Sequence, residues 1–147
     1  MTKATVRLDE GYKAVIQIRD HTLFADEPIS DGGTNAGPTS KEYLLAALGA
    51  CAAITMKMYA QRKQWPLEGV EIDLGTERFK VPDYPAYTGE GEFVHEFKQR
   101  IHLKGALSDE QKQRLIEIAG KCPVHRALTE PNYMIEQLVD SIIAEEP

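Results

Sequence analysis

The chain has 147 residues, of which 42% are hydrophobic and 27% charged, and this composition predicts one ordinary globular domain spanning residues 1–147. The formal net charge is −6 at pH 7, which argues against nucleic acid or an anionic membrane surface as a partner. The longest apolar run, Tyr43 to Ile54, is shorter than a bilayer span requires, so we expect a buried core helix there.

The N-terminal segment and the cysteine content indicate the cellular compartment. The first residues, beginning Met1-Thr2-Lys3, carry no apolar signal region, and we therefore expect a cytoplasmic protein. The two cysteines, Cys51 and Cys122, have the spacing of neither a disulfide scaffold nor a zinc cluster, so we expect no metal. They are either buried structural thiols or a redox pair brought together by folding.

The first part of the chain has the pattern of strands. Two stretches of strand character lie between Thr5 and Phe24, with Glu10-Gly11 as the turn between them. In the second stretch, Ala14, Ile16 and Ile18 alternate with polar neighbours, as one buried face of a sheet requires. The sequence therefore predicts a β-hairpin.

A glycine-rich segment, residues 31–38, predicts a flexible loop after this hairpin. The segment lacks the pattern of a phosphate-binding loop, so we reject that function for it. Thr39 and Glu42 follow with the spacing of a capping box, in which each side chain bonds the other residue's backbone N–H. We therefore predict that a helix begins at this point.

The helix that begins here is almost entirely apolar and continues to about Lys63, and Trp65-Pro66 ends it. Such a helix is expected to form the centre of the core. Gly49 lies inside it and marks either close packing or a break just before Cys51. A break would place Cys51 near a helix N-terminus, where a thiolate is favoured.

Two further strands are predicted after the helix. Val70, Ile72 and Leu74 alternate with acidic residues, and a second strand extends from Phe93 to Leu103. The proline- and tyrosine-rich segment between them, 81–89, is either a lid or subunit contact or a plain connecting loop. The acidic residues near the first of these strands fit an exposed face better than a cation site: Glu68, Glu71, Asp73 and Glu77.

Cys122 lies at the start of a second helical region. Ser108 and Gln111 form another capping-box pattern, which opens a helix that Gly120 ends. Pro123 then makes Cys122 the natural N-cap of a short helix, whose free amides and positive dipole end favour a thiolate.

The C-terminal segment is ambiguous. From Met134 to Ile143 apolar residues recur with helical spacing, although many of them are β-formers. Periodicity alone favours a helix.

Two segments carry a family resemblance. The sequence from Gly37 to Cys51 and the segment from Lys121 to Leu128 closely resemble the cysteine-bearing signatures of the OsmC/Ohr family of peroxide-reducing proteins. The resemblance implies an α+β, OsmC-like fold, in which an intertwined homodimer has two long central helices wrapped by antiparallel sheets, with the active sites at the subunit interface. It also implies that the C-terminal segment is a strand, which we adopt over the helical periodicity.

The resemblance further implies a thiol-dependent peroxidase that prefers organic hydroperoxides to hydrogen peroxide. In that family pattern Cys51 attacks the peroxide, and Cys122 then forms a Cys51–Cys122 disulfide. An external dithiol reduces this disulfide by exchange, so no bound cofactor and no metal is required.

The resemblance also points to an arginine that holds the thiolate charged and to a glutamate that positions this arginine. The family's glutamate lies one position before Glu42, where this chain has Lys41, and Glu42 is also explained as a capping residue. Arg19 is the arginine nearest to the position where the family supplies one, and a solvated strand end explains it equally. Both are candidate catalytic residues.

Two alternatives remain open. His125 lies within a turn of Cys122 and would stabilise a thiolate as His⁺, although a solvated position on the helix is the preferred interpretation. The second alternative is a non-catalytic OsmC-like dimer that binds a small hydrophobic ligand at the subunit interface. In that case the cysteines serve only as packing residues.

Overall fold

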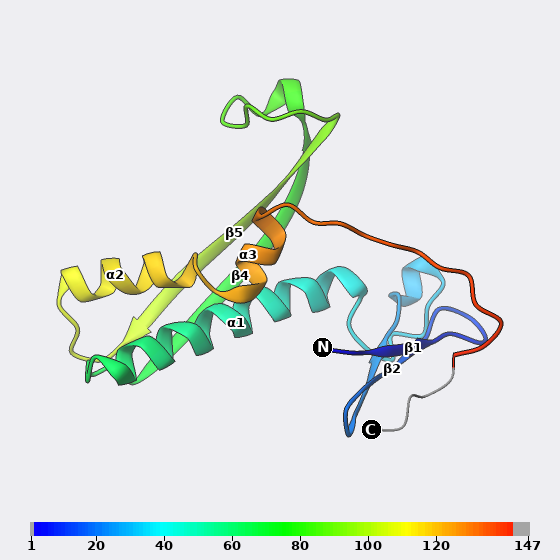
Figure 1. Cartoon of the computed structure of the whole chain (residues 1–147), viewed down its shortest axis with the longest axis horizontal. Coiled ribbons are helices and arrows are strands. Elements are labelled where there is room, and N and C mark those ends of the chain that lie inside the picture. Colours follow the sequence, from blue (N-terminus) through cyan, green and yellow to red (C-terminus); the bar gives the residue numbers. More distant parts are fainter. Residues whose placement is uncertain (1, 143–147) are drawn as a thin grey trace.

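The computed structural model describes residues 2–142 and shows an α+β fold (Figure 1). A long helix lies at its centre and packs against a long two-stranded antiparallel sheet of β4 and β5. A three-stranded antiparallel sheet of order β1-β2-β3 lies toward the N-terminal end of this helix. Two shorter helices pack beside the long one. The bounds are β1 Thr5–Arg7, β2 Ala14–Ile18, β3 His21–Ala25, α1 Ser40–Arg62, β4 Gly69–Lys80, β5 Phe93–Lys104, α2 Asp109–Ala119 and α3 Pro123–Thr129.

Helix α1 begins and continues as its sequence predicts. The Thr39 N–H donates to Glu42 Oε2 at 2.7 Å and the Glu42 N–H donates to Thr39 Oγ1 at 3.3 Å, which confirms the capping box. The helix passes through Gly49 without a break, so the prediction of a break there is wrong. A Cβ at Gly49 would lie 2.7 Å from Leu74 Cδ1 of β4. The glycine therefore allows close packing of helix against sheet.

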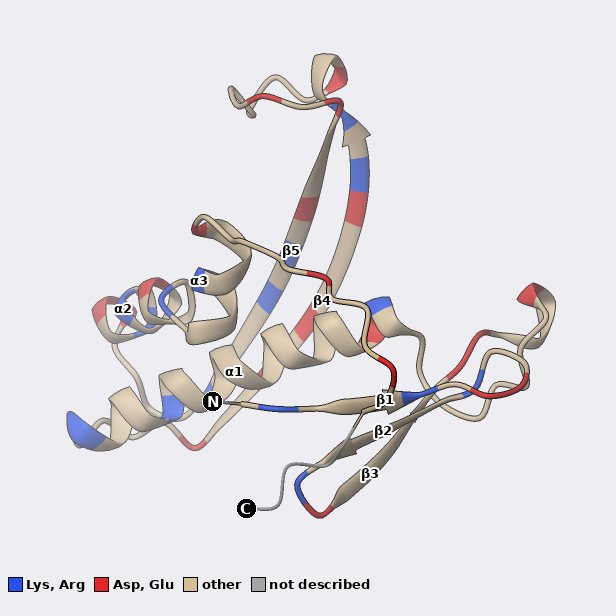
Figure 2. Cartoon of the chain, turned by 45° about the vertical axis from the view of Figure 1, so that its right-hand side comes forward, with Lys and Arg blue, Asp and Glu red and all other residues tan. Residues whose placement is uncertain are grey.

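One face of α1 forms the core, and the opposite face is open. Ile54 and Met58 on the open face are 59% and 57% exposed. No charged residue occurs between Glu42 and Lys57, so the middle of the helix is uncharged on every side (Figure 2). The buried face lies against α2, α3 and β4. Its fully buried residues recur every four positions: Leu48, Ala52, Met56 and Ala60.

Within the described residues, α1 is the one helix that is long and apolar enough to cross a membrane by length and composition. The run Tyr43–Ile54 alone is too short to span a bilayer, but the whole helix is not, because apolar residues also follow that run. The length prediction is therefore wrong for the whole helix. A core helix passes the same test, and Leu48 and Met56 of α1 lie in the same hydrophobic core as Leu115 of α2. These contacts explain why α1 is so apolar.

The N-terminal sheet has one more strand than the sequence predicts. Gly11 in the first turn has φ of 65°, and β1 pairs with β2 as expected. The second predicted stretch is itself a hairpin of β2 and β3, because the chain reverses at Arg19, whose φ is 51°. This turn carries no glycine, so composition did not reveal it.

The glycine-rich loop is organised around one buried carboxylate rather than being flexible. Asp26 is 3% exposed and accepts hydrogen bonds from the N–H groups of Glu27, Thr34 and Ala36 at 2.8, 3.1 and 3.1 Å. The Thr34 hydroxyl donates a fourth bond at 2.5 Å. A Cβ at Gly33 would lie 1.9 Å from the Glu27 carbonyl oxygen, so this loop also needs its glycine.

We expect Asp26 to give the fold a characteristic loss of stability in acid. The Thr34 hydroxyl and then the Ala36 N–H lower its pKa from 3.8 to about 2. Because the folded pKa lies below the unfolded one, the carboxylate stabilises the fold above about pH 4 and this stabilisation is lost as the pH falls through about 2. Urea unfolding from pH 6 to pH 2 should show a weaker acid dependence for Asp26→Asn than for the wild type. The matched variant Asp9→Asn, at an exposed position, should keep the wild-type dependence.

The hairpin of β4 and β5 is longer than predicted and extends beyond the helices (Figure 1). At its tip, the Tyr84 hydroxyl donates to the Glu96 carboxylate, and the Phe79 and Tyr84 rings lie 5.0 Å apart. The connecting segment thus folds back on its own hairpin. Within one chain it is a connecting loop and not a lid, because it lies away from α1 and α3 (Figure 1).

The C-terminal segment forms neither predicted element in the residues described. Residues 130–142 leave α3 without helix or strand and run back toward the three-stranded sheet (Figure 1). Tyr133 is 90% exposed and Met134 is 79% exposed. The helical periodicity and the strand implied by the resemblance both need a surface to pack on, and the described chain supplies none; Ile143 lies outside the described residues.

Candidate functional site

Folding brings the two cysteines together at the contact of α1 with α3. Cys51 lies in the middle of α1, and Cys122 is the N-cap of α3, as predicted. Both are free thiols, and they interact with each other, since the Cys51 thiol contributes to the pKa of Cys122. The structure therefore supports the interpretation of a pair brought together by folding.

The two thiols differ in accessibility. Cys122 is fully buried, whereas Cys51 is half-buried. On α1, Cys51 shares a strip with Leu44 and Met58, which lie seven residues to either side and are 38% and 57% exposed. A ligand on the open apolar face of α1 would thus reach Cys51, with Cys122 behind it.

The expected acidity of Cys122 is reversed by its burial. Burial is the largest effect on this thiol and raises its pKa, and the neighbouring Cys51 thiol raises it further. The backbone N–H of His125 donates to Cys122 Sγ at 3.3 Å and, together with that of Val124, lowers the pKa by less. The N-cap prediction is confirmed, but burial raises the pKa of the Cys122 thiol by more than the helix N-terminus lowers it.

Glu42 and Arg19 do not join the cysteines within one chain. Nine residues of helix place Glu42 and Cys51 on opposite faces of α1, and one Glu42 oxygen caps Thr39. Arg19 lies in the exposed turn between β2 and β3, and the main-chain carbonyl oxygen of Arg19 accepts from Gln17 at 2.7 Å. The catalytic roles of Glu42 and Arg19 stay predictions.

Two buried polar atoms among the described residues have no hydrogen-bond partner: Gln99 Oε1 and His125 Nδ1. His125 is half-buried with Nδ1 buried, so it is only partly the solvated residue that the sequence favoured. His125 lies three residues after the N-cap of α3, the position that Glu42 has in α1 and Gln111 has in α2. This spacing is the feature of the sequence that could have identified it. Gln99 lies on the inward-facing side of β5, a position that strand alternation would have identified.

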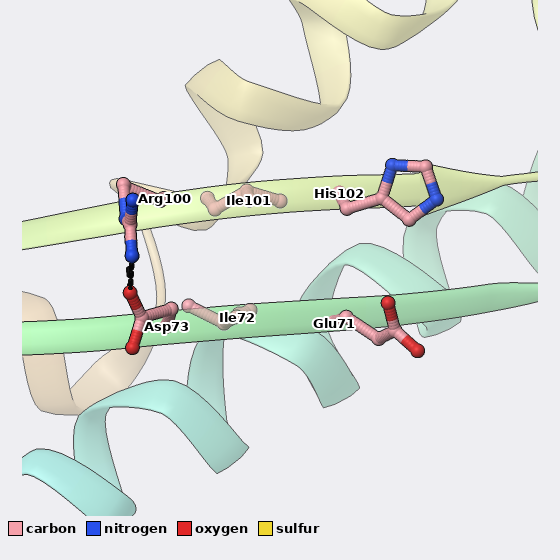
Figure 3. A pocket seen from close by; sticks show the side chains of 6 residues that line it. All are labelled: Glu71, Ile72, Asp73, Arg100, Ile101 and His102. Atoms are coloured by element: carbon pink, nitrogen blue, oxygen red, sulfur yellow. Dashed lines mark hydrogen bonds and ion pairs between the residues drawn. The ribbon is translucent and has the colours of Figure 1, made fainter.

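One surface cleft, on the β4–β5 hairpin, contains neither cysteine. It has a volume of about 390 Å³ and lies on the outer face of β4 and β5 (Figure 3). Arg100 Nε donates to Asp73 Oδ2 at 2.9 Å, and Lys104 Nζ pairs with Glu71 Oε1 at 2.5 Å. The acidic residues of β4 thus serve as cross-strand partners on an exposed face. Within the described residues no group of three or more His, Cys, Asp or Glu side chains is arranged to hold a metal.

A second, apolar groove lies beside the open face of α1 and has a volume of about 290 Å³. Small side chains of α1 line one wall and branched side chains of β4 line the other. The lining residues are Ala46, Gly49, Ala50 and Ala53 of α1 and Val70, Ile72 and Leu74 of β4.

Comparisons with known proteins identify the fold. The sequence model of OsmC-like proteins matches residues 32–136. The structure resembles an OsmC like protein from Mycoplasma pneumoniae, with a TM-score of 0.71 and 20% identity over 88% of each chain. It also resembles the organic hydroperoxide resistance protein OhrB of Bacillus subtilis, with a TM-score of 0.61 and 20% identity over 88% of this chain and 91% of that one.

A third similar structure is the organic hydroperoxide resistance protein OsmC from Legionella pneumophila, with a TM-score of 0.64 and 20% identity over 88% of this chain and 90% of that one. No curated protein matches the chain. These identities show a shared fold, and the sequence model covers both cysteine signatures. The chain, with its paired Cys51 and Cys122, therefore belongs to the OsmC-like family.

Proposed function

We propose that this protein is a thiol-dependent peroxidase that reduces organic hydroperoxides through Cys51 and Cys122. The observation that carries the proposal is the meeting of these two thiols, one half-buried beside an open apolar face and the other fully buried behind it. Membership in the OsmC-like family supports a redox role, and two of the similar structures are named as organic hydroperoxide resistance proteins.

The cycle needs no group beyond the two thiols and an external reductant. The Cys51 thiolate attacks the O–O bond, takes one oxygen as sulfenic acid and releases the alcohol after protonation. Cys122 then displaces the sulfenic hydroxyl, which leaves as water, and the Cys51–Cys122 disulfide forms. An external dithiol reduces this disulfide by exchange. Cys51 is the sulfur more open to that dithiol, because Cys122 is fully buried.

Substrate preference follows from the surface beside Cys51. Leu44 and Met58 flank it on the exposed strip of α1, so an alkyl or aromatic group would bury apolar surface there. Each Å² removed from water contributes roughly 25 cal/mol, which hydrogen peroxide cannot gain. We therefore infer that bulky hydroperoxides are the better substrates.

We also propose that the protein is a homodimer in which a second copy covers the open face of α1. This face is apolar, lies beside an apolar groove and includes Ile54 at 59% exposure. The exposed apolar side chains of Tyr133 and Met134 in the C-terminal segment similarly lack a covering surface within the chain. Exposed apolar side chains that gather on one face in this way are typical of an interface between subunits. The same groove would also suit a small hydrophobic ligand, which is the alternative function.

Thiol counting tests the peroxidase directly. One equivalent of cumene hydroperoxide should remove both free thiols of the reduced protein, while circular dichroism stays unchanged. The same dose of hydrogen peroxide should remove them more slowly. Retention of both thiols after several equivalents, together with saturable binding of cumyl alcohol, would instead support the ligand-binding alternative.

A further inference from the structure

In all three helices the N-cap side chain accepts a hydrogen bond from the backbone N–H three residues later. Helix α3 differs from the other two in what the side chain of that third residue does. In α1, the Glu42 carboxylate accepts from the Thr39 backbone N–H at 2.7 Å. In α2, the Gln111 side chain accepts from the Ser108 N–H at 3.0 Å. In both helices this third side chain therefore reaches back to the capping residue.

In α3 the corresponding pair is Cys122 and His125, and the bond back to the capping residue is missing. The Cys122 N–H donates instead to the Ala119 carbonyl oxygen at 3.3 Å. The His125 backbone N–H does bond Cys122 Sγ, at 3.3 Å, so the start of the helix is held in place. The imidazole is left with Nδ1 buried and without a partner. The backbone nitrogen of the same residue lies 3.3 Å from Cys122 Sγ, which keeps the imidazole near the thiol, although no hydrogen bond joins Nδ1 to Sγ.

A buried nitrogen without a hydrogen-bond partner costs folding stability, so its presence calls for an explanation. In the proposed cycle, Cys122 must lose its proton to attack the sulfenic acid, and burial opposes this by raising its pKa. A base beside Cys122 would remove that obstacle.

Three of the other carboxylates at the helices that meet here are already engaged. Glu117 of α2 pairs with Arg114 at 2.7 Å, and Glu130 at the end of α3 pairs with Arg126 at 2.8 Å. Glu42 is held in its capping box. The remaining charged side chains of α1, α2 and α3, with the linking Lys121, are the cations Lys41, Lys57, Arg62 and Lys112 and the acids Asp109 and Glu110 in the first turn of α2.

We propose that His125 is a further catalytic residue, the base that takes the Cys122 proton in the resolving step. In this step Nδ1 of His125 accepts the proton from Cys122 Sγ. The thiolate attacks the Cys51 sulfenic sulfur, the S–S bond forms and the S–O bond breaks. The departing hydroxide takes the proton from the imidazolium and leaves as water. His125 is regenerated, and no other reactant is consumed. This role rests on the proposed peroxidase function.

His125→Gln tests the role, because glutamine can restore the capping-box bond but cannot act as the base. Stopped-flow measurements with cumene hydroperoxide should show sulfenic acid forming on Cys51 within about twofold of the wild-type rate. Disulfide formation should be about 100-fold slower. Dimedone should then trap sulfenic acid on Cys51, detected by mass spectrometry. The matched variant His102→Gln, on the exposed side of β5, should resolve at the wild-type rate.

His125→Ala separates a chemical role from a structural one. Added imidazole should accelerate disulfide formation in His125→Ala and have no effect on the wild type. Disulfide formation at the wild-type rate in His125→Gln would overturn the inference, and so would a slow His125→Ala that imidazole does not accelerate. A wild-type protein that forms no sulfenic acid at all would overturn the peroxidase function itself, which distinguishes the two failures.

Discussion

Cys51→Ser is expected to abolish peroxide consumption, whereas Cys122→Ser should complete one turnover and stop with a sulfenic acid on Cys51. The reason is the difference between the two sites: Cys51 is half-buried beside open apolar surface, while Cys122 is fully buried with a raised pKa. Peroxide consumption by each variant, followed by dimedone labelling and mass spectrometry, measures both effects.

The wild type provides the control for this pair of variants. After peroxide treatment it should show a Cys51–Cys122 link within one chain and no dimedone adduct. A sulfenic acid on Cys122 in Cys51→Ser would contradict the assigned order, because it would mean that the helix N-terminus outweighs burial at that thiol. Equal peroxide consumption by both variants and the wild type would exclude the redox function altogether.

Ile54→Arg is expected to convert a wild-type dimer into a monomer. Ile54 lies on the open face of α1 and is 59% exposed, so in a single chain an arginine there would remain in water at little cost. In a homodimer that buries this face, the unpaired charge would cost about 3–5 kcal/mol, or more than 100-fold in the dissociation constant. Sedimentation velocity at micromolar concentration distinguishes the two states.

Ile116→Arg is the matched control for the dimer. Ile116 is also an exposed isoleucine on a helix, at 41%, but it lies on α2. Its variant should sediment as the wild type does. A wild-type chain that sediments as a stable folded monomer would contradict the homodimer and would leave the groove beside α1 for a small ligand.

The sequence predicted best the features that depend on a few neighbouring residues. The capping boxes at Thr39 and Ser108 and the N-cap at Cys122 are confirmed, because each needs bonds only within one helical turn. The core helix and the β4–β5 pair are also confirmed, since the period of apolar residues fixes which side is buried.

Most features that the sequence missed depend on contacts outside the helical turn or strand in which the residue lies. The pKa of Cys122 is decided by burial against α1, which outweighs the local effect of its own helix. Asp26 orders the glycine loop through Thr34 and Ala36, and no local pattern reveals that contact. The C-terminal segment has strong apolar periodicity but no surface within the described chain to pack on, so neither helix nor strand forms there.

The burial of Cys122 behind Cys51 also determines how a peroxidase of this design would be inactivated. Excess peroxide meets Cys51 first, so further oxidation to sulfinic acid would begin at this sulfur while the buried thiol stays intact. The number of turnovers before inactivation would then depend on two competing rates at the Cys51 sulfenic acid: attack by Cys122 and attack by a second peroxide molecule. The close approach of the two thiols favours the first of these, and the protein's tolerance of its own substrate would be set by how fast the inner cysteine responds.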